Sequence, residues 1–306
     1  MAHEPIRRIA LVGFGEVGGI FGRDFAAQGI DVSIFDILLH AQESREAMLA
    51  KARDVKVHAK ESLADSVRDA ELVISAVTAS SALDVAKDAS RLLRAGQFFL
   101  DINSVSPATK RAMADLFAHG QGRFVEAAVM AAVPPQRLKV PMLLGGSHAA
   151  ELAPRLRALG MNATPASDRV GVPSAVKMCR SVMIKGLEAL TVECLFAARR
   201  HGAEEAVLAS LAATYPDMGW KGKLPDYLIS RVAEHGKRRA AEMREAARAL
   251  RDVGLDPLMA EATAERQEWL VGEIAGLDAG GLTDESFSWR ALADAIDAAL
   301  KAAKKE

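Results

Sequence analysis

The stretch that decides the fold is IALVGFGEVGGIFG, residues 9–22, in which a short apolar run leads into three glycines at GxGxxG spacing. We expect the run to be a β-strand and the residues after the glycines to begin a helix. Gly13 would permit the tight turn, Gly15 would let the backbone approach a pyrophosphate, and Gly18 would let the helix pack closely on the strand. Free N–H groups at the helix start would face the phosphates. The stretch therefore predicts a dinucleotide-binding site.

An acidic residue follows the second apolar run. Asp36 comes directly after residues 31–35, at a position where a carboxylate can bind a ribose 2′-hydroxyl. The same charge would repel a 2′-phosphate, so NAD is favoured over NADP, while Arg45 on the following helix leaves NADP open. Glu16 brings an acid into a loop meant for phosphates, and we expect its side chain to face outward.

The first half of the chain alternates short strand-like runs with segments of helical composition. This alternation predicts parallel strands joined by crossover helices, and therefore a doubly wound, Rossmann-type α/β sheet. After about residue 170 the strand pattern ends and only helices are expected. We predict a Rossmann domain over residues 1–169 and an all-helical domain over 170–306. The predicted strands are 9–12, 31–35, 55–58, 72–77, 98–102, 124–128 and 141–144, and the predicted breaks between helices are 201–202, 216–225, 254–257 and 272–281.

Size and charge exclude several classes of protein. The 306 residues carry a net charge of −1, which gives no basic face for nucleic acid. No apolar run approaches the roughly 20 residues that span a bilayer, and the N-terminus lacks the shape of a signal peptide. Cys179 and Cys194 show no metal-ligand spacing, and neither do the histidines, so no metal is expected. We expect a cytoplasmic protein that binds neither nucleic acid nor membrane.

The stretch AVKMCRSVMIKG, residues 175–186, puts lysines into an otherwise apolar helix. The polar residues of this segment recur at helical spacing and form one narrow stripe along the helix. This stripe is either the solvent side of the helix or the lining of a site in which a lysine exchanges protons. Lys185 and Glu188 are interpreted as a solvated or interface pair. The residues that recur at helical spacing and form this narrow polar stripe are Lys177, Ser181, Lys185 and Glu188.

A second helix, residues 234–257, carries many charges. Its apolar positions define an inward stripe, and counting back along it by fours reaches Arg239 and then His235. An unpaired cation on the buried side of a helix is costly. Arg239 and His235 therefore either pair with carboxylates of the protein or meet an anionic substrate, and both interpretations stay open.

The order of these motifs resembles the β-hydroxyacid dehydrogenase superfamily, which includes 6-phosphogluconate and 3-hydroxyisobutyrate dehydrogenases. VGFGEVGGIFG (12–22) is similar to its dinucleotide loop, and DINSVSP (101–107) resembles the segment beside the nicotinamide, with Ser104 in place of the usual threonine. RVGVPSAVKMCRS (169–181) resembles the helix with the catalytic lysine, which assigns that role to Lys177 and substrate binding to Ser181. The cofactor-binding set is then Gly13, Phe14, Gly15, Glu16, Val17, Gly18, Asp36, Thr78 and Ser104.

Two motifs depart from those of the family. Its substrate loop, usually aspartate-alanine-proline-valine-serine-glycine-glycine, reads EAAVMAA at residues 126–132. Met130 stands in place of the serine and is kept as a candidate substrate contact. The late lysine-aspartate motif is absent. The resemblance therefore implies the cofactor and the type of reaction, and it leaves the substrate open.

The expected function is that of an NAD(P)-dependent oxidoreductase acting on a small hydroxy acid or a related alcohol or ketone. Lys177 would be the general acid/base, and its apolar neighbours would lower the pKa of its amine. His235 and Arg239 are candidate contacts for an anionic substrate. Oxidative decarboxylation of a 3-hydroxy acid and a non-catalytic dinucleotide sensor are the alternatives. We also expect a homodimer whose helical domains interlock.

Overall fold

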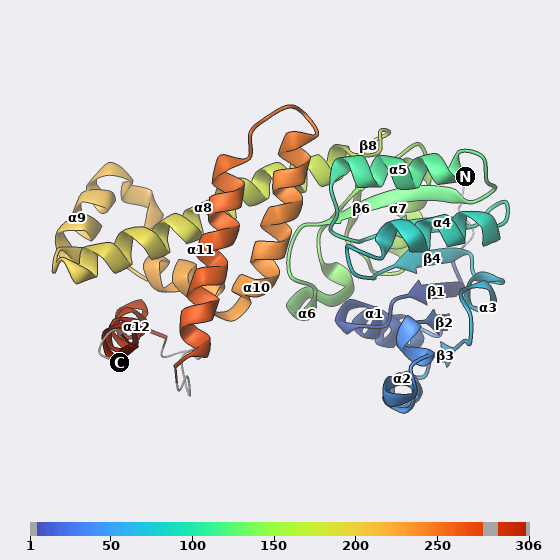
Figure 1. The fold of residues 1–306 in the computed structure, drawn as a ribbon. Helices are drawn as coiled ribbons and strands as arrows, with labels where there is room; N and C mark the ends of the chain where they lie inside the picture. Colours follow the sequence, from blue (N-terminus) through green and yellow to red (C-terminus); the bar gives the residue numbers. More distant parts are fainter. Residues whose placement is uncertain (1–4, 278–286, 304–306) are drawn as a thin grey trace. The chain divides into compact units, whose positions relative to one another are not determined.

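The helix that links the two halves of the chain is also where the structure divides. The computed structural model describes residues 5–277 and 287–303, which belong to an α/β unit up to Lys177 and a helical unit from Met178 onward (Figure 1). The division falls inside helix α8 (Val172–Arg200), beyond the boundary that the sequence predicted at residue 170. The first turn of α8 belongs to the α/β unit because the carboxylate of Glu126, on the sheet, binds the backbone at the helix start.

One eight-stranded sheet forms the centre of the α/β unit, in the order β3-β2-β1-β4-β5-β6-β7-β8. The order changes direction between β1 and β4, and the crevice at the carboxyl ends of such neighbouring strands is where doubly wound sheets bind ligands. The strands are β1 (Arg8–Val12), β2 (Asp31–Phe35), β3 (His58–Ala59), β4 (Leu72–Ser75), β5 (Phe98–Asp101), β6 (Arg123–Val129), β7 (Met142–Gly145) and β8 (Ala163–Ser167).

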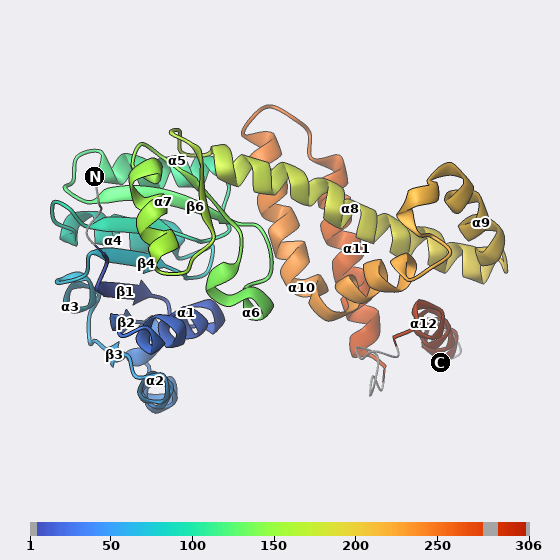
Figure 2. The same cartoon turned by 180° about the vertical axis from the view of Figure 1, so that it is seen from behind.

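Both faces of the sheet are covered by helices, as Figures 1 and 2 show from opposite sides. Alternate residues of β1 pack into different apolar clusters, Ile9 and Leu11 into one and Ala10 and Val12 into the other. This explains why β1 is apolar at every position from Ile9 to Val12, since side chains alternate between the two faces of a strand. The helices are α1 (Glu16–Ala27), α2 (Gln42–Asp54), α3 (Leu63–Val67), α4 (Ala82–Leu92), α5 (Pro107–Phe117), α6 (Val133–Gln136) and α7 (Ala149–Ala158).

The far edge of the sheet departs from the sequence-based expectation. β7 runs antiparallel to β6, although parallel strands were predicted throughout. β8 was not predicted at all, because its sequence ATPAS has no apolar run and only Ala163 is fully buried. The strand predicted at 55–58 is two residues long and begins only at His58. Edge strands carry a weak apolar signal because they are less buried than central strands.

The helical unit packs around a core that includes Val192, Ile229 and Trp289. Helices α10 and α11 lie side by side at Gly236, where an added Cβ would come within 2.5 Å of the Val271 side chain. The unit contains the rest of α8 together with α9 (Glu204–Thr214), α10 (Leu224–Arg251), α11 (Leu258–Ala275) and α12 (Trp289–Ala303).

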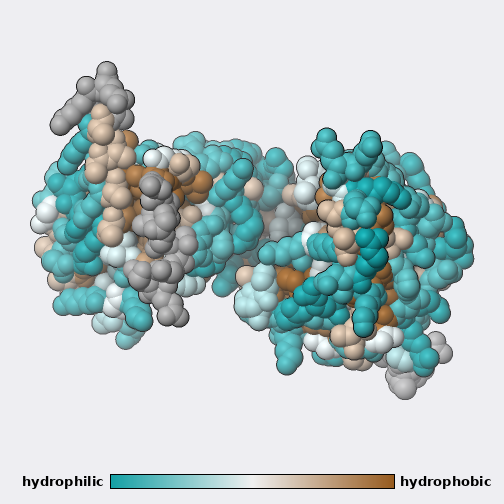
Figure 3. Space-filling model, turned by 90° about the horizontal axis from the view of Figure 1, so that it is seen from below, coloured by the Kyte–Doolittle hydropathy of each residue, from teal (hydrophilic) through white to brown (hydrophobic). Residues whose placement is uncertain are grey.

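The predicted helix breaks in this unit agree with the structure at three of four places. Helices end and begin again around 201–202, 216–225 and 254–257. The fourth break was placed too early, because α11 continues through Gly272 to Ala275, and residues 278–281 of that predicted break lie outside the described residues. No helix of the described residues is long and apolar enough to cross a membrane. Hydrophilic side chains cover most of the face drawn in Figure 3.

Candidate dinucleotide site and catalytic lysine

The glycine loop between β1 and α1 has the backbone that the motif predicts. Gly13 has a φ of +90°, which favours glycine, and a Cβ there would lie 2.4 Å from the Ala76 carbonyl oxygen. A Cβ on Gly18 would lie 2.2 Å from the carbonyl oxygen of Gly13, so the helix approaches the loop too closely for any side chain. At Gly15 nothing lies within 4 Å of an added Cβ. The loop is therefore closed on its inner side and open at Gly15.

The start of α1 is suited to an anionic group. Gly15 is its N-cap and has no side chain to bond the first backbone N–H groups of the helix. Helix N–H groups without such a partner, together with the helix dipole, attract phosphate. Glu16 is exposed, as predicted, and Val17 is half-buried beside it. These residues fit the pyrophosphate of a dinucleotide.

Asp36 lies where the sequence predicted, directly after β2. One carboxylate oxygen accepts the backbone N–H of Phe14 at 2.7 Å, and the other accepts that of Leu38 at 3.0 Å. Asp36, predicted to contact the ribose, therefore also holds the glycine loop. Each carboxylate oxygen can accept more than one hydrogen bond, so these contacts leave capacity for a ribose hydroxyl.

The loops after β4 and β5 are tied together by Asn103. Its side-chain N–H₂ donates to Ser75 Oγ at 2.9 Å, and its oxygen accepts the Val77 backbone N–H at 2.8 Å. Thr78 is exposed at the end of the first loop, within hydrogen-bond distance of the Ser81 hydroxyl. Ser104 follows Asn103 directly. Two of the predicted cofactor contacts beyond the glycine loop, Thr78 and Ser104, thus lie on segments that one buried amide fixes.

Two residues that the resemblance selected are brought into contact. Lys177 Nζ donates a hydrogen bond to Ser104 Oγ at 2.6 Å, although the residues are far apart in the sequence. Ser104 comes from the loop at the carboxyl end of β5, and Lys177 comes from the second turn of α8. The amine is thereby placed at the carboxyl edge of the sheet, within the same unit as the glycine loop.

A buried carboxylate anchors the start of α8. Glu126 on β6 is fully buried and accepts the backbone N–H groups of Gly171 at 2.8 Å and Ser174 at 3.2 Å. Burial raises the pKa of this carboxyl, while the charge of Lys110 and the two N–H groups oppose the rise. Ser174 lies one turn before Lys177. Glu126 therefore fixes the turn that leads to the lysine.

Sequence reasoning missed Lys110, which is paired with Asp101 in the core of the α/β unit. The sequence does contain a pattern that indicates a buried position for this lysine. Lys110 precedes Met113 and Phe117 at spacings of three and seven, so it lies on the buried stripe of α5. A lysine on such a stripe indicates a buried acidic partner.

The polar stripe of α8 is its buried side in the helical unit. Lys185 and Glu188 were predicted to be a solvated or an interface pair, and the first of these alternatives is wrong. Ser181, Lys185 and Glu188 are all buried. Lys185 donates to Ser181 Oγ at 3.0 Å and pairs with Glu242 on α10 at 2.8 Å. Ser181, predicted to bind substrate, thus already accepts a hydrogen bond from its own helix.

Arg239 also has a carboxylate partner within the chain. One guanidinium nitrogen lies 2.7 Å from both oxygens of Glu188. Burial lowers the pKa of Arg239 and raises that of Glu188, and each partner's charge opposes the shift. His235 lies half-buried near Glu234, and burial lowers the pKa of its imidazole. Of the two interpretations left open for Arg239, the geometry favours the structural pair.

The remaining predicted substrate contact, Met130, lies half-buried at the end of β6, where its backbone N–H donates to Pro141. Among the described residues no group of three or more His, Cys, Asp or Glu side chains could hold a metal ion. Both cysteines are free thiols on the exposed side of α8.

Comparison with known families decides the relationship. A family model described as the NAD binding domain of 6-phosphogluconate dehydrogenase matches residues 8–166, more than half of the chain. The chain belongs to the β-hydroxyacid dehydrogenase superfamily. A second model, a domain of unknown function (DUF1932), matches residues 198–270 in the helical unit. Membership of this superfamily confirms both the resemblance and the Rossmann-type fold.

Solved structures agree with this assignment. A conserved hypothetical protein from Sinorhizobium meliloti is 36% identical with a TM-score of 0.81, over 95% of this chain and 96% of that chain. The conserved protein MTH1747, described as similar to 3-hydroxyacid dehydrogenases, is 31% identical with a TM-score of 0.71, over 86% and 96%. A 3-hydroxyisobutyrate dehydrogenase from Mycobacterium tuberculosis shares the fold at 15% identity and a TM-score of 0.71, over 94% and 98%. These matches support a dinucleotide-dependent oxidoreductase.

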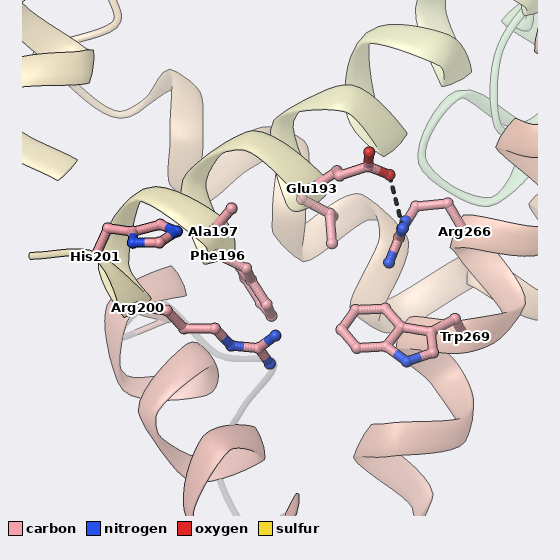
Figure 4. Close-up of a pocket in the computed structure, with 8 residues that line it drawn as sticks. Glu193, Phe196, Ala197, Arg200, His201, Arg266 and Trp269 are labelled. Carbon is pink, nitrogen blue, oxygen red and sulfur yellow. Dashed lines mark ion pairs between the residues drawn. The ribbon is translucent and has the colours of Figure 1, made fainter. Parts of the chain in front are cut away.

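A cavity of about 330 Å³ opens in the helical unit between the end of α8 and α11. Figure 4 shows Phe196 and Trp269 along its wall and the ion pair between Glu193 and Arg266, 2.7 Å apart. The Arg266 guanidinium also stacks on the Trp269 ring, 4.9 Å from its centroid. The cavity is therefore bounded by aromatic rings and by charges that are already paired.

Replacing Arg239 by alanine tests whether it is structural. The Glu188 carboxylate is only 2% exposed, so R239A leaves a buried charge without its partner and should lower the free energy of unfolding by about 3–5 kcal/mol. The double variant R239M/E188M removes both charges and should recover most of that loss. Urea unfolding of the two variants measures this. Unchanged stability in R239A would refute the structural role and return Arg239 to the list of anion contacts.

Proposed function

We propose that this protein is an NAD(P)-dependent dehydrogenase of a small hydroxy acid or a related alcohol or ketone, with Lys177 as its general acid/base. The observation that carries the proposal is the hydrogen bond from Lys177 Nζ to Ser104 Oγ. It joins the residue of the catalytic-lysine motif to the residue of the nicotinamide-side motif, within the unit that holds the glycine loop. A lysine with a purely structural role would not need to lie beside the nicotinamide-side motif.

The reaction divides between the cofactor and the chain's own residues. Bound NAD(P) supplies the hydride chemistry, which needs a partner for the hydroxyl proton. In the oxidative direction the neutral amine of Lys177 takes the proton from the substrate hydroxyl as the hydride leaves the carbinol carbon, and a carbonyl forms. In the reductive direction the Lys177 ammonium returns that proton to the carbonyl oxygen.

Two further residues support Lys177 in this role. Ser104 Oγ accepts from the amine and fixes the position of Nζ. Glu126 fixes the first turn of α8, so the lysine stem starts from a rigid point. A general acid/base must lie within about 3 Å of the oxygen it serves, and both contacts limit how far Nζ can move.

Lys177→Met is the direct test of catalysis. Methionine keeps the apolar stem and deletes the amine, so the fold and NADH binding should persist while turnover falls by roughly 10²–10⁴-fold. The substrate is identified beforehand by a cofactor-coupled screen of hydroxy acids and their carbonyl counterparts at neutral and alkaline pH. Lys237→Met, at an exposed lysine of α10, is the matched control and should leave turnover unchanged. Near-normal turnover in K177M would defeat the mechanism.

We propose that the cofactor is NAD rather than NADP because Asp36 stands at the ribose position. Arg45, which left NADP open, forms two hydrogen bonds to Glu61 at 2.6 and 3.0 Å and one to the Leu39 carbonyl at 2.7 Å. Its guanidinium is thus already engaged by partners within the protein. Proteins of similar fold include one solved with NADP⁺, at 16% identity and a TM-score of 0.61, so the fold alone does not choose between the two cofactors.

Asp36→Asn tests the cofactor preference without substrate. Asparagine keeps an oxygen for the Phe14 N–H, whereas alanine would also release the loop. NADH should bind more tightly than NADPH to the unmutated protein, and D36N should narrow that difference because the repulsion of a 2′-phosphate is removed. Fluorescence titration with both nucleotides gives the two dissociation constants. If the unmutated protein bound NADH and NADPH with equal affinity, Asp36 would not set the cofactor preference.

We propose that the protein is a homodimer that buries the exposed side of α8. With its polar stripe turned inward, the helix leaves apolar side chains outside, among them Met183 at 74% and Leu190 at 54% exposure. Ala197 follows on the same face and leads into the cavity beside Trp269. A contiguous exposed apolar face favours an interface. The partner that covers this face is a second copy of the chain, because a two-fold symmetric dimer is formed by the same surface of both copies.

Leu190→Glu tests this interface. A charge at the centre of the face must be desolvated on association, so the variant should be a monomer at micromolar concentration where the unmutated protein is a dimer. Val253→Glu places the same charge at an exposed apolar residue after α10 and should leave the dimer intact. Light scattering coupled to size-exclusion chromatography measures both masses. A monomeric unmutated protein would contradict the proposal.

A further inference from the structure

A lysine outside every motif reaches the glycine loop. Lys51, near the end of α2, donates from Nζ to the carbonyl oxygens of Phe14 at 2.5 Å and Gly15 at 2.7 Å. Its ammonium also lies over the Phe14 ring, 4.7 Å from the centroid. Lys51 is therefore in direct contact with the loop that holds the dinucleotide.

The first turn of α1 places a further glycine beside this lysine. Gly13, Gly15 and Gly18 make up the motif, but Gly19 follows them without a role in it. A Cβ on Gly19 would lie 2.9 Å from Cε and 3.1 Å from Nζ of Lys51. Gly19 thus leaves the space through which the lysine side chain passes.

Lys51 and Asp36 bind the two peptide groups that flank the Cα of Phe14. Asp36 accepts the N–H of Phe14, and Lys51 donates to the carbonyl oxygen of Phe14. Burial lowers the pKa of the Lys51 amine, and the charge of Asp36 opposes that shift, so the two charges act on each other. A cation therefore stands close to the carboxylate that marks the ribose position.

We propose that Lys51 is a cofactor-specificity residue that offsets the charge of Asp36 and provides a counter-ion for the 2′-phosphate of NADPH. The site then prefers NADH because of Asp36, yet still accepts NADPH because of Lys51. Arg45 does not compete for this role, since Glu61 binds it. The inference rests on the dinucleotide site proposed at the glycine loop and is independent of any reaction at Lys177.

Fluorescence titration of NADH and NADPH into the unmutated protein and Lys51→Met is the test. Methionine keeps the stem over Phe14 and removes the ammonium together with its two hydrogen bonds to the loop. K51M should weaken NADPH binding at least tenfold and NADH binding less than threefold, so it widens the difference that D36N narrows. Arg45→Met is the matched control and should leave the ratio of the two dissociation constants unchanged.

A second variant checks the result without altering Lys51 itself. Gly19→Ala puts a methyl group where the lysine stem passes, and it should reproduce the selective loss of NADPH binding by moving the ammonium away. Equal weakening of both nucleotides in K51M would make Lys51 a holder of the loop alone and overturn its role in specificity. No change for either nucleotide would overturn it as well. If D36N leaves the ratio unchanged while K51M alters it, the ribose position fails and Lys51 is retained.

Discussion

The binding of the first turn of α8 by the buried carboxylate of Glu126 is the interaction on which the proposed active site depends. A helix start leaves backbone N–H groups without partners, and here the sheet supplies the acceptor. The helix therefore begins at a fixed point of the α/β unit. Lys177 follows one turn later, and its reach to Ser104 is set by that anchor.

This anchor carries an energetic cost that the surrounding charges reduce. A buried carboxylate is unfavourable unless it is paired or hydrogen-bonded. Lys110, itself buried and paired with Asp101, lowers the cost for Glu126 from one side, and the positive end of α8 lowers it from the other. Removing one member of such a set leaves another uncompensated. The cluster is thus better suited to holding a fixed geometry than to adding stability.

Helix α8 shows that tertiary contacts can turn the polar side of an amphipathic helix inward. An isolated amphipathic helix turns its polar stripe to water. In α8 the stripe faces inward, because α10 supplies Glu242 for Lys185 and Arg239 for Glu188. The apolar side chains remain outside as a consequence. The same local pattern therefore describes a buried polar network on one side of the helix and an apolar face on the other.

The sequence by itself determined the first strand, the glycine loop, the position of Asp36 and the succession of an α/β half by a helical half. These features follow from local rules, since a tight turn needs Gly13 and a strand covered on both faces needs apolar residues at every position. The motif that placed Lys177 could also be read from the chain. Only the tertiary structure decided which charges meet. Each of these contacts joins residues distant in the sequence: Glu126 with α8, Arg239 with Glu188, and Lys51 with the glycine loop. The partner of a charged residue is fixed only when folding brings the two groups together and excludes water around them.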